Sequence, residues 1–142
     1  MHRIFGKREH VEYMDREGAY IIPYRNHEVG VIQTQKGYFF VGGGMECGES
    51  HLKGIARECL EETGHLINVK SKLCSAEAYM YHPVIGFFHP VQTYYLGELL
   101  DKVSEPAESD HKLCWIEYDQ LKGKMFLEMQ NWALEQLFAY LI

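Results

Sequence analysis

Three glutamates are spaced so that one helix would place their carboxylates on the same face: Glu58, Glu61 and Glu62. At about 100° per residue, positions i, i+3 and i+4 are neighbours on a helix surface. Clustered carboxylate oxygens suit a hard divalent ion such as Mg²⁺ or Mn²⁺ better than they suit zinc. Without a cation, the like charges of Glu58 and Glu62 would destabilise the helix by roughly 0.2 to 0.5 kcal/mol. The spacing therefore indicates a magnesium or manganese site, and a solvated charged face is the structural alternative.

The residues around these glutamates predict a helix from about Ser50 to Thr63. Ser50 is a favourable N-cap, and Gly64 is a favourable stop because glycine adopts the left-handed conformation that ends many helices. The face beside the acidic one is apolar, and it predicts that the helix packs on a core through Leu52, Ile55, Ala56 and Cys59.

Arg57 lies inside the acidic cluster, four residues before Glu61 and eight residues after Glu49. Its guanidinium could pair with either carboxylate and offset part of the repulsion between the acidic side chains. Upstream, residues 42 to 44 are all glycine, which allows positive φ and a close approach of the backbone to a ligand. This combination opposes the interpretation of the acidic face as an ordinary charged surface.

From Gly43 to His65 the sequence resembles the Nudix box of the Nudix hydrolase family, G-x5-E-x7-R-E-U-x-E-E-x-G-U, in which U is an aliphatic residue. All seven fixed positions are filled, which chance would produce at on the order of one in 10⁸ starting positions. The sequence departs from the family pattern at three places. His65 and Cys59 occupy the aliphatic positions, and Val41 replaces a proline that commonly precedes the glycines. These are packing positions rather than positions of the chemistry.

The resemblance implies that the protein hydrolyses a pyrophosphate bond in a nucleoside diphosphate derivative with Mg²⁺ or Mn²⁺ as cofactor. It implies that Glu61 and Glu62 are the principal metal ligands and that Glu58 is a further ligand or the general base. It also implies that Arg57 orients Glu58 and pairs with Glu49. The predicted catalytic residues are therefore Glu58, Arg57 and Glu61.

Further ligands follow from the same resemblance. The carbonyl of Gly43 can contact the metal in the family, and a carboxylate from outside the box often completes the site. The candidates in the acidic segment of residues 101 to 112 are Glu105, Glu108 and Asp110, of which we choose Glu108. Within the box, Glu49 and Gly64 are predicted to have structural roles.

Aromatic side chains and two prolines are concentrated between Tyr79 and Pro90. We predict a loop or a bent hairpin in which Tyr79, Tyr81 and Phe87 stack on the nucleobase of a substrate. The structural alternative is that these rings cover the core.

The resemblance leaves several substrates open, and a nucleoside triphosphate or related nucleotide is our first choice. Tyr81 lies sixteen residues after His65, near the place where a tyrosine accompanies dinucleoside polyphosphate hydrolysis in the family. Such a substrate, or a nucleotide sugar, is the alternative. A Nudix domain that binds a nucleotide as a sensor without turnover is a further interpretation. The presence of every carboxylate of the box opposes it.

Composition and charge describe an ordinary globular chain. Its 142 residues, of which 46% are hydrophobic and 24% charged, fit a single domain over residues 1–142. The formal net charge of −6 argues against a nucleic-acid partner and leaves a small-molecule nucleotide as the expected partner. The N-terminus lacks the apolar core of a signal peptide, and no apolar run is long enough to span a membrane. We therefore expect a cytoplasmic protein with reduced cysteines and no membrane partner, and the sequence leaves a homodimer open.

Outside the predicted helix, apolar and β-favouring runs alternate with turn signals. We predict a hairpin of residues 19–24 and 29–34, further strands at 38–41, 67–70, 76–81, 92–100 and 113–117, a short helix near 120 capped by Asp119, and a C-terminal helix over 126–141. Helices that interrupt and follow a set of strands predict an α/β fold with a mixed sheet. The resemblance implies the same fold, a Nudix-type α/β/α sandwich.

Overall fold

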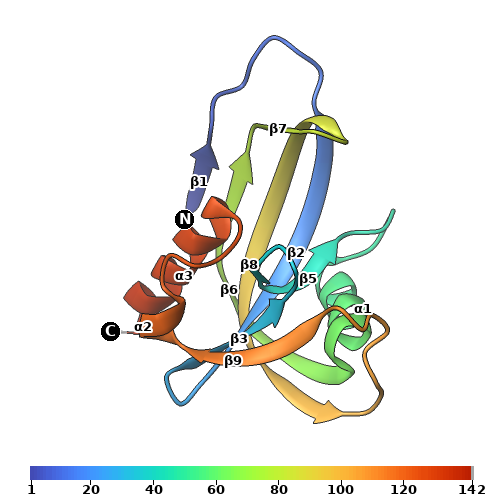
Figure 1. Cartoon of the computed structure of the whole chain (residues 1–142), viewed down its shortest axis with the longest axis vertical. Coiled ribbons are helices and arrows are strands. Elements are labelled where there is room, and N and C mark those ends of the chain that lie inside the picture. The colour runs from blue at the N-terminus through green and yellow to red at the C-terminus, as the bar shows by residue number, and fades with distance from the viewer. Residues whose placement is uncertain (142) are drawn as a thin grey trace.

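The computed structural model describes residues 1–141 (Figure 1), so Ile142, the last residue of the predicted domain, lies outside the described part. The elements of this part run in the order β1 (His2–Phe5), β2 (Met14–Arg25), β3 (Glu28–Gln33), β4 (Tyr38–Phe39), β5 (Val41–Gly44), α1 (His51–Thr63), β6 (His65–Ala78), β7 (Met80–His82), β8 (Gly86–Lys102), β9 (Lys112–Glu117), α2 (Tyr118–Leu121) and α3 (Glu128–Leu141).

The strands form one branched sheet whose main path is β1-β6-β8-β2-β3-β4. Off this path, β5 pairs with β2, β7 with β8 and β9 with β3. The pairs β1·β6 and β2·β8 are parallel, and the other pairs are antiparallel. The sheet is therefore mixed, as predicted.

The two long helices cover opposite faces of this sheet, with α1 on one side and α3 on the other in Figure 1. The core under α1 consists of buried apolar residues from the helix and three strands: Ala19, Ile21, Ile32, Val41, Ile55 and Cys59. A larger core under α3 includes Phe40, Tyr94, Trp132, Leu134 and Leu137. Two cores on either side of one sheet make the predicted α/β/α sandwich.

The helix α1 has the boundaries that its capping residues predict. The Ser50 side chain accepts a hydrogen bond from the Lys53 N–H at 3.3 Å, and Gly64 ends the helix in the left-handed conformation with φ of 76°. The Gly64 N–H bonds to the Leu60 carbonyl at 3.0 Å. Both ends of the helix are thus fixed by residues adjacent to the acidic face.

The apolar stripe predicted for α1 is only half right. Ile55 and Cys59 are fully buried, whereas Leu52 is 54% exposed and Ala56 is also exposed. The helix turns its buried face toward β5 instead, so that Gly54, Glu62 and Thr63 complete it. One of the predicted acidic residues therefore belongs to the packed side of the helix.

Several predicted strands are longer than expected. The prediction at 67–70 and the first half of the prediction at 76–81 lie in β6, which runs unbroken to Ala78. The end of the second prediction lies in β7, which begins at Met80. The exposed polar residues Lys70 to Lys72 hid this continuity, and the register with β8 shifts there, as a bulged strand allows. No pattern in the sequence predicted β1, which pairs in parallel with the far end of β6.

The hairpins are formed by short turns. Between β2 and β3, Asn26 and His27 have φ of 50° and 65°, the backbone of a tight two-residue hairpin. In the aromatic segment, β7 and the start of β8 pair from Met80↔Phe88 to His82↔Gly86. Of the two forms considered for this segment, the bent hairpin is confirmed.

The C-terminal helices start elsewhere than predicted. The helix α2 begins at Tyr118, so Asp119 lies in its first turn and does not cap it. The helix α3 begins at Glu128 rather than 126, because the Phe126 N–H bonds to the Tyr38 carbonyl and the Met125 N–H to the Asn131 side chain. Residues 125 and 126 thereby join β4 instead of the helix.

Two properties bear on the expected setting of the protein. Within residues 1–141, no helix combines the length and the apolar character needed to cross a membrane. All four cysteines are free: Cys47, Cys59, Cys74 and Cys114.

Candidate active site

Glu62 joins the acidic face of α1 to the glycine strand β5. Its Oε1 accepts a hydrogen bond from the Gly42 N–H at 2.9 Å, and the residue is only 9% exposed. Burial raises the pKa of Glu62 to about 8, although the bond from Gly42 acts in the opposite direction. The protein alone therefore leaves the charge of this carboxylate largely uncompensated.

Arg57 makes the contacts expected of it. Its Nε and Nη2 donate to the two oxygens of Glu49, both at 2.9 Å, and its Nη1 donates to Glu58 Oε1 at 2.9 Å. Nη2 also donates to the Gly44 carbonyl at 3.1 Å. The hydrogen bonds from Arg57 lower the pKa of Glu49 to about 2. This guanidinium therefore connects the start of the helix, its acidic face and the end of β5.

Glu58 lies directly against the backbone of Gly43. A Cβ on residue 43 would come within 2.7 Å of the Glu58 carboxyl carbon, so a side chain there would displace the Glu58 carboxylate. Burial raises the pKa of Glu58, and Arg57 opposes the rise. Glu61 is half exposed, with its Oε1 at 3.7 Å from Arg57 Nη1. The glutamates on this face thus range from exposed to buried, and Glu58 lies between the extremes.

The linker before β9 approaches the acidic face. The Ala107 N–H bonds to the Glu61 carbonyl at 2.7 Å, and His111 Nδ1 lies 3.6 Å from Glu62 Oε2. The other nitrogen of His111 is 3.3 Å from Glu108, and Asp110 lies close enough for the donor atoms of all three residues to be within 4.8 Å of one another. Among the carboxylates predicted from outside the box, Glu108 is therefore linked to Glu62 by way of His111, which contacts both.

The other candidates from the linker are placed differently. Glu105 points to Lys102, at 3.3 Å, whereas Asp110 lines the same cavity as Glu62. Among residues 1–141, His111 Nδ1 is a buried nitrogen without a hydrogen-bond partner. An incoming ligand could supply that partner.

These donors fit a hard divalent cation. The carboxylates of Glu58, Glu61 and Glu62 supply oxygen only, which suits Mg²⁺ or Mn²⁺. The raised pKa of Glu62 supports the fit, because a positive ion would stabilise its charged form. The backbone of Gly43 lies against Glu58, and a metal contact by its carbonyl stays a prediction.

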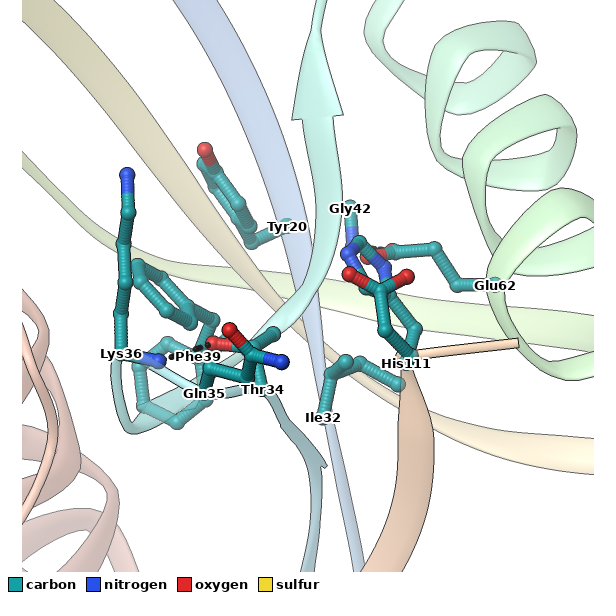
Figure 2. A pocket seen from close by; sticks show the side chains of 11 residues that line it. Tyr20, Ile32, Thr34, Gln35, Lys36, Phe39, Gly42, Glu62 and His111 are labelled. Carbon is teal, nitrogen blue, oxygen red and sulfur yellow. Dashed lines mark hydrogen bonds and ion pairs between the residues drawn. The ribbon is translucent and has the colours of Figure 1, made fainter. Parts of the chain in front are cut away.

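A cavity of about 430 Å³ opens beside Glu62. Figure 2 shows Lys36 and Phe39 on one side of it, Glu62 and His111 on the other, and Tyr20 between them. Its lining residues come from β2, β3, β4, β5, α1 and the loops beside them: Tyr20, Ile32, Thr34, Gln35, Lys36, Phe39, Phe40, Gly42, Glu62, Asp110 and His111. The volume and the mixture of aromatic and polar groups suit a small organic ligand.

One wall of the cavity is a closed turn between β3 and β4. Thr34 and Gly37 exchange backbone hydrogen bonds at 2.9 and 3.2 Å, and the Thr34 hydroxyl accepts from the Lys36 N–H at 3.1 Å. Gly37 has φ of 142°, a conformation that favours glycine. The turn therefore holds Gln35 and Lys36 at the cavity without using their side chains to form it.

The predicted substrate-stacking residues lie elsewhere. Tyr79, Tyr81 and Phe87 gather with Tyr13 at the β7–β8 hairpin, with ring centroids 5.1 to 5.7 Å apart. Tyr79 also stacks on His89 at 4.4 Å. The structure does not bring these rings to the cavity beside Glu62.

Sequence reasoning missed the partners that tertiary structure brings to the helix. His111 contacts Glu62, and Tyr20 and Phe39 line the cavity, yet none of them has a fixed spacing from the acidic face. The run of glycines marked Gly42, but its contact with Glu62 was not predicted. The signals that could have found them are weak. His111 closes an acidic segment, and Lys36 directly precedes Gly37 between two predicted strands.

Comparisons with known proteins agree with this arrangement. A family model described as NUDIX domain matches residues 14–139. A solved structure titled as a NUDIX hydrolase from Nitrosomonas europaea is similar in fold, with a TM-score of 0.74 at 15% identity, over 89% of this chain and 90% of that one. A MutT NUDIX hydrolase from Burkholderia pseudomallei is similar with a TM-score of 0.72 at 22% identity, over 87% of this chain and 98% of that one.

Proposed function

Because the chain belongs to the Nudix family of hydrolases, we propose that it hydrolyses a nucleoside triphosphate to a nucleoside monophosphate and pyrophosphate. The family supports hydrolysis of a pyrophosphate bond in a nucleotide-type substrate. The observation that carries the finer proposal is the cavity next to Glu62, which can hold one nucleoside while the phosphates lie at the acidic face.

Glu61 and Glu62 would hold Mg²⁺ or Mn²⁺, together with the Gly43 carbonyl and with Glu108 through its approach beside His111. When bound, the ion neutralises phosphate oxygens and lowers the pKa of a bound water. The metal would thus lie at Glu62, the most buried carboxylate of the acidic face, and at its neighbours.

Glu58 would accept the proton of the attacking water. Burial raises its pKa toward the range in which a carboxylate is an effective base, and Arg57 fixes one of its oxygens at 2.9 Å. Water forms the new bond to phosphorus as the anhydride bond breaks, and pyrophosphate leaves with the bonding electrons. Arg57 contributes by positioning Glu58, while Glu49 holds Arg57.

The nucleoside would lie between Tyr20 and Phe39, whose rings line the cavity (Figure 2). Aromatic rings stack on any base, with about 1 to 3 kcal/mol for each stacked base. Gln35 and Lys36 offer donors and an acceptor at the same wall. The alternative of a dinucleoside polyphosphate depends on Tyr81. This residue is 64% exposed on the β7–β8 hairpin and does not line the cavity, so we place this substrate second.

We propose that residues 1–142 act as one domain in the cytoplasm, without a nucleic-acid or membrane partner. The four free cysteines support a reducing compartment, and the net charge of −6 opposes binding to nucleic acid. A homodimer is compatible with this activity and is not required by it.

The test is a substrate panel with Mg²⁺. Nucleoside triphosphates, dinucleoside polyphosphates and nucleotide sugars are incubated separately, and the products are separated by chromatography. We expect the fastest turnover with a triphosphate, giving monophosphate and pyrophosphate in equal amounts. Faster cleavage of a dinucleoside polyphosphate or a sugar nucleotide would overturn the triphosphate proposal, and binding without turnover would favour the sensor interpretation.

A further inference from the structure

Arg16 lies beside the glycine strand on the side away from the acidic helix. It is exposed on β2, two residues before Gly18, which pairs with Gly44 of β5. A Cβ on residue 44 would lie 2.5 Å from Arg16 Nε and 2.7 Å from Nη2, so the guanidinium packs against the backbone of Gly44. Successive residues of a strand face opposite sides. Glu58 accordingly meets Gly43 on one face of β5, and Arg16 meets Gly44 on the other.

Arg16 differs from Arg57 in its partners. Arg57 is within 4.0 Å of four carboxylates, those of Glu46, Glu49, Glu58 and Glu61. Arg16 makes no ion pair within the part of the chain that the structure describes, residues 1–141. Its positive charge still reaches the site, where it acts to lower the pKa values of Glu58 and Tyr20 against the rise that burial causes. A cation beside an acidic site is therefore left free to bind an anion.

A stretch of glycine backbone connects Arg16 with the cavity, and the Tyr20 ring lies beside it, 3.2 Å from where a Cβ on residue 18 would be. Gly42 lines the cavity, and two strand residues further, about 6.6 Å at 3.3 Å per residue, Gly44 lies under Arg16. On β2 the matching stretch runs from Tyr20 past Gly18 to Arg16, all on one face of the strand. A Cβ on residue 18 would be 3.1 Å from the Gly43 carbonyl oxygen. The β5 strand is thus a stretch of glycine backbone with the cavity at one end and the Arg16 guanidinium at the other.

We propose that Arg16 is a substrate-binding residue that holds the terminal phosphate of the polyphosphate, with the chain of phosphates lying along the edge of β5 from the cavity. This inference rests on the proposed function, because it takes the nucleoside to occupy the cavity. Carboxylates and the ion they hold would then meet the phosphates from the α1 face, and Arg16 would meet them from the opposite face. A guanidinium can bind two phosphate oxygens at once through parallel N–H groups, which a lysine ammonium cannot.

The test measures pyrophosphate binding by calorimetry in the presence of Mg²⁺, together with steady-state kinetics on the triphosphate that the wild type cleaves fastest. We expect Arg16→Gln to weaken pyrophosphate binding about tenfold or more, as loss of a charge-assisted hydrogen bond would. KM for the triphosphate should rise by a similar factor, while kcat changes less than about threefold. Arg16→Lys should recover part of the affinity, since the charge returns without the fork.

The matched control is Arg25→Gln, the same substitution at the opposite end of β2, where the guanidinium stacks on Trp115 at 3.8 Å. It should bind pyrophosphate as the wild type does. A purely structural role for Arg16 would lower the melting temperature of Arg16→Gln and leave its pyrophosphate affinity unchanged, which would overturn the proposal. Wild-type protein that fails to bind pyrophosphate would overturn it as well.

The binding measurement separates this inference from the proposed function. If the wild type cleaves triphosphates and Arg16→Gln binds pyrophosphate normally, the role of Arg16 is wrong and the function stands. If no triphosphate is cleaved but pyrophosphate binding depends on Arg16, the anion site stands and the function is wrong.

Discussion

At the scale of single residues, the site depends on a carboxylate that the fold buries without a compensating charge. Glu62 is enclosed by β5 and the linker, with the Gly42 N–H as its hydrogen-bond donor and His111 as its neighbour. An ordinary surface glutamate would not be held at this cost in solvation. The burial is understandable if the working form of the protein contains a cation there.

This burial gives a pH-dependent stability in the metal-free protein. The pKa of Glu62 is raised to about 8 in the folded state, so between pH 5 and pH 8 the folded protein keeps a proton that the unfolded chain releases. The free energy of unfolding that Glu62 contributes is therefore fully present below the pKa of a glutamate in the unfolded chain. It is lost as pH rises through about 8, the pKa in the folded state. With chelator present, Glu62→Gln should therefore be more stable than the wild type at pH 9, on the order of 2 kcal/mol. The two proteins should differ little at pH 5.

Thermal unfolding of both proteins at several pH values measures this difference, which corresponds to about 5 °C in Tm at pH 9. Saturating Mg²⁺ should remove most of it by stabilising the ionised wild type. A difference that is the same at every pH would show that the Glu62 carboxyl is not protonated in the metal-free fold. The same substitution should abolish most turnover.

Arg57 provides the second residue-scale prediction. An exposed ion pair contributes at most about 1 kcal/mol, but Arg57 also positions Glu58 and the end of β5. A misplacement near 1 Å can lower kcat by about 10²-fold. We expect both Arg57→Ala and Arg57→Lys to reduce kcat substantially with a smaller change in KM. Steady-state kinetics at saturating Mg²⁺ measure kcat and KM of both variants, with Arg25→Ala as the control. A near-wild-type kcat in Arg57→Ala would show that Arg57 is not part of the site.

Some of these residue contacts could be predicted and others could not, for a physical reason. The pairing of Arg57 with Glu49 and Glu58 follows from positions along one helix and its start, which local geometry determines. The contacts of Glu62 with Gly42 and His111 depend on how β5 and β9 lie relative to the helix. No local rule specifies that arrangement.

At the scale of elements, α1 and the linker before β9 form one unit. Gly64 accepts both the Val103 and the Ser104 N–H groups at its carbonyl, at 2.8 and 3.3 Å, and the Ala107 N–H binds the Glu61 carbonyl. This docking brings His111 to Glu62. The end of the helix therefore positions a segment that starts nearly forty residues later.

The prediction for this unit concerns Gly64→Ala. Residue 64 has φ of 76°, and a Cβ there would overlap the Ser104 carbonyl oxygen. Gly123→Ala is the matched control, because its φ is 75° and nothing lies within 4 Å of the added Cβ. The conformational cost, about 1 kcal/mol, should appear in both variants. Gly64→Ala should lose at least about 1 kcal/mol more, since the linker must move.

Denaturant unfolding compares the two variants, and turnover is measured on the same samples. Gly64→Ala should also be slower than Gly123→Ala because His111 and Glu108 are displaced. Equal losses of stability in the two variants would show that the linker adapts without cost.

Elements were predictable where a local signal marks both ends. The caps of α1 predicted its boundaries, and apolar, β-favouring runs predicted β3 and β9 nearly completely. The pattern failed where bulges interrupt a strand, as in β6, and where pairing alone makes a strand, as in β1. It failed for the cavity beside Glu62 too, because Tyr20 and Phe39 belong to different strands that meet only in the folded sheet.

At the scale of the whole molecule, α1 and α3 lie on opposite faces of a mixed sheet. Within residues 1–141, β5 pairs only with β2, so its other edge has no partner strand and lies between α1 and the strands β3, β4 and β9. Since the proposed metal ligands come from α1, β5 and the linker, metal binding should stabilise the folded state as a whole. A ligand at 100 times its Kd adds about 2.7 kcal/mol. We expect Mg²⁺ or Mn²⁺ to raise Tm, a general chelator to abolish turnover, and a zinc-selective chelator to change neither. Full turnover in metal-free buffer would contradict the oxygen-only site.

The central claim is that the acidic face of α1 performs the hydrolysis, and the most direct measurement is kcat of Glu61→Gln on the preferred triphosphate at saturating Mg²⁺. Glu61 is half exposed, so its substitution should leave the fold intact. Glu135→Gln, on the exposed surface of α3, is the matched control. We predict that Glu61→Gln lowers kcat by about 10²-fold or more, as loss of an electrostatic group at a transition state does, while the control keeps the wild-type rate. A folded Glu61→Gln protein that turns over as fast as the control would contradict the account.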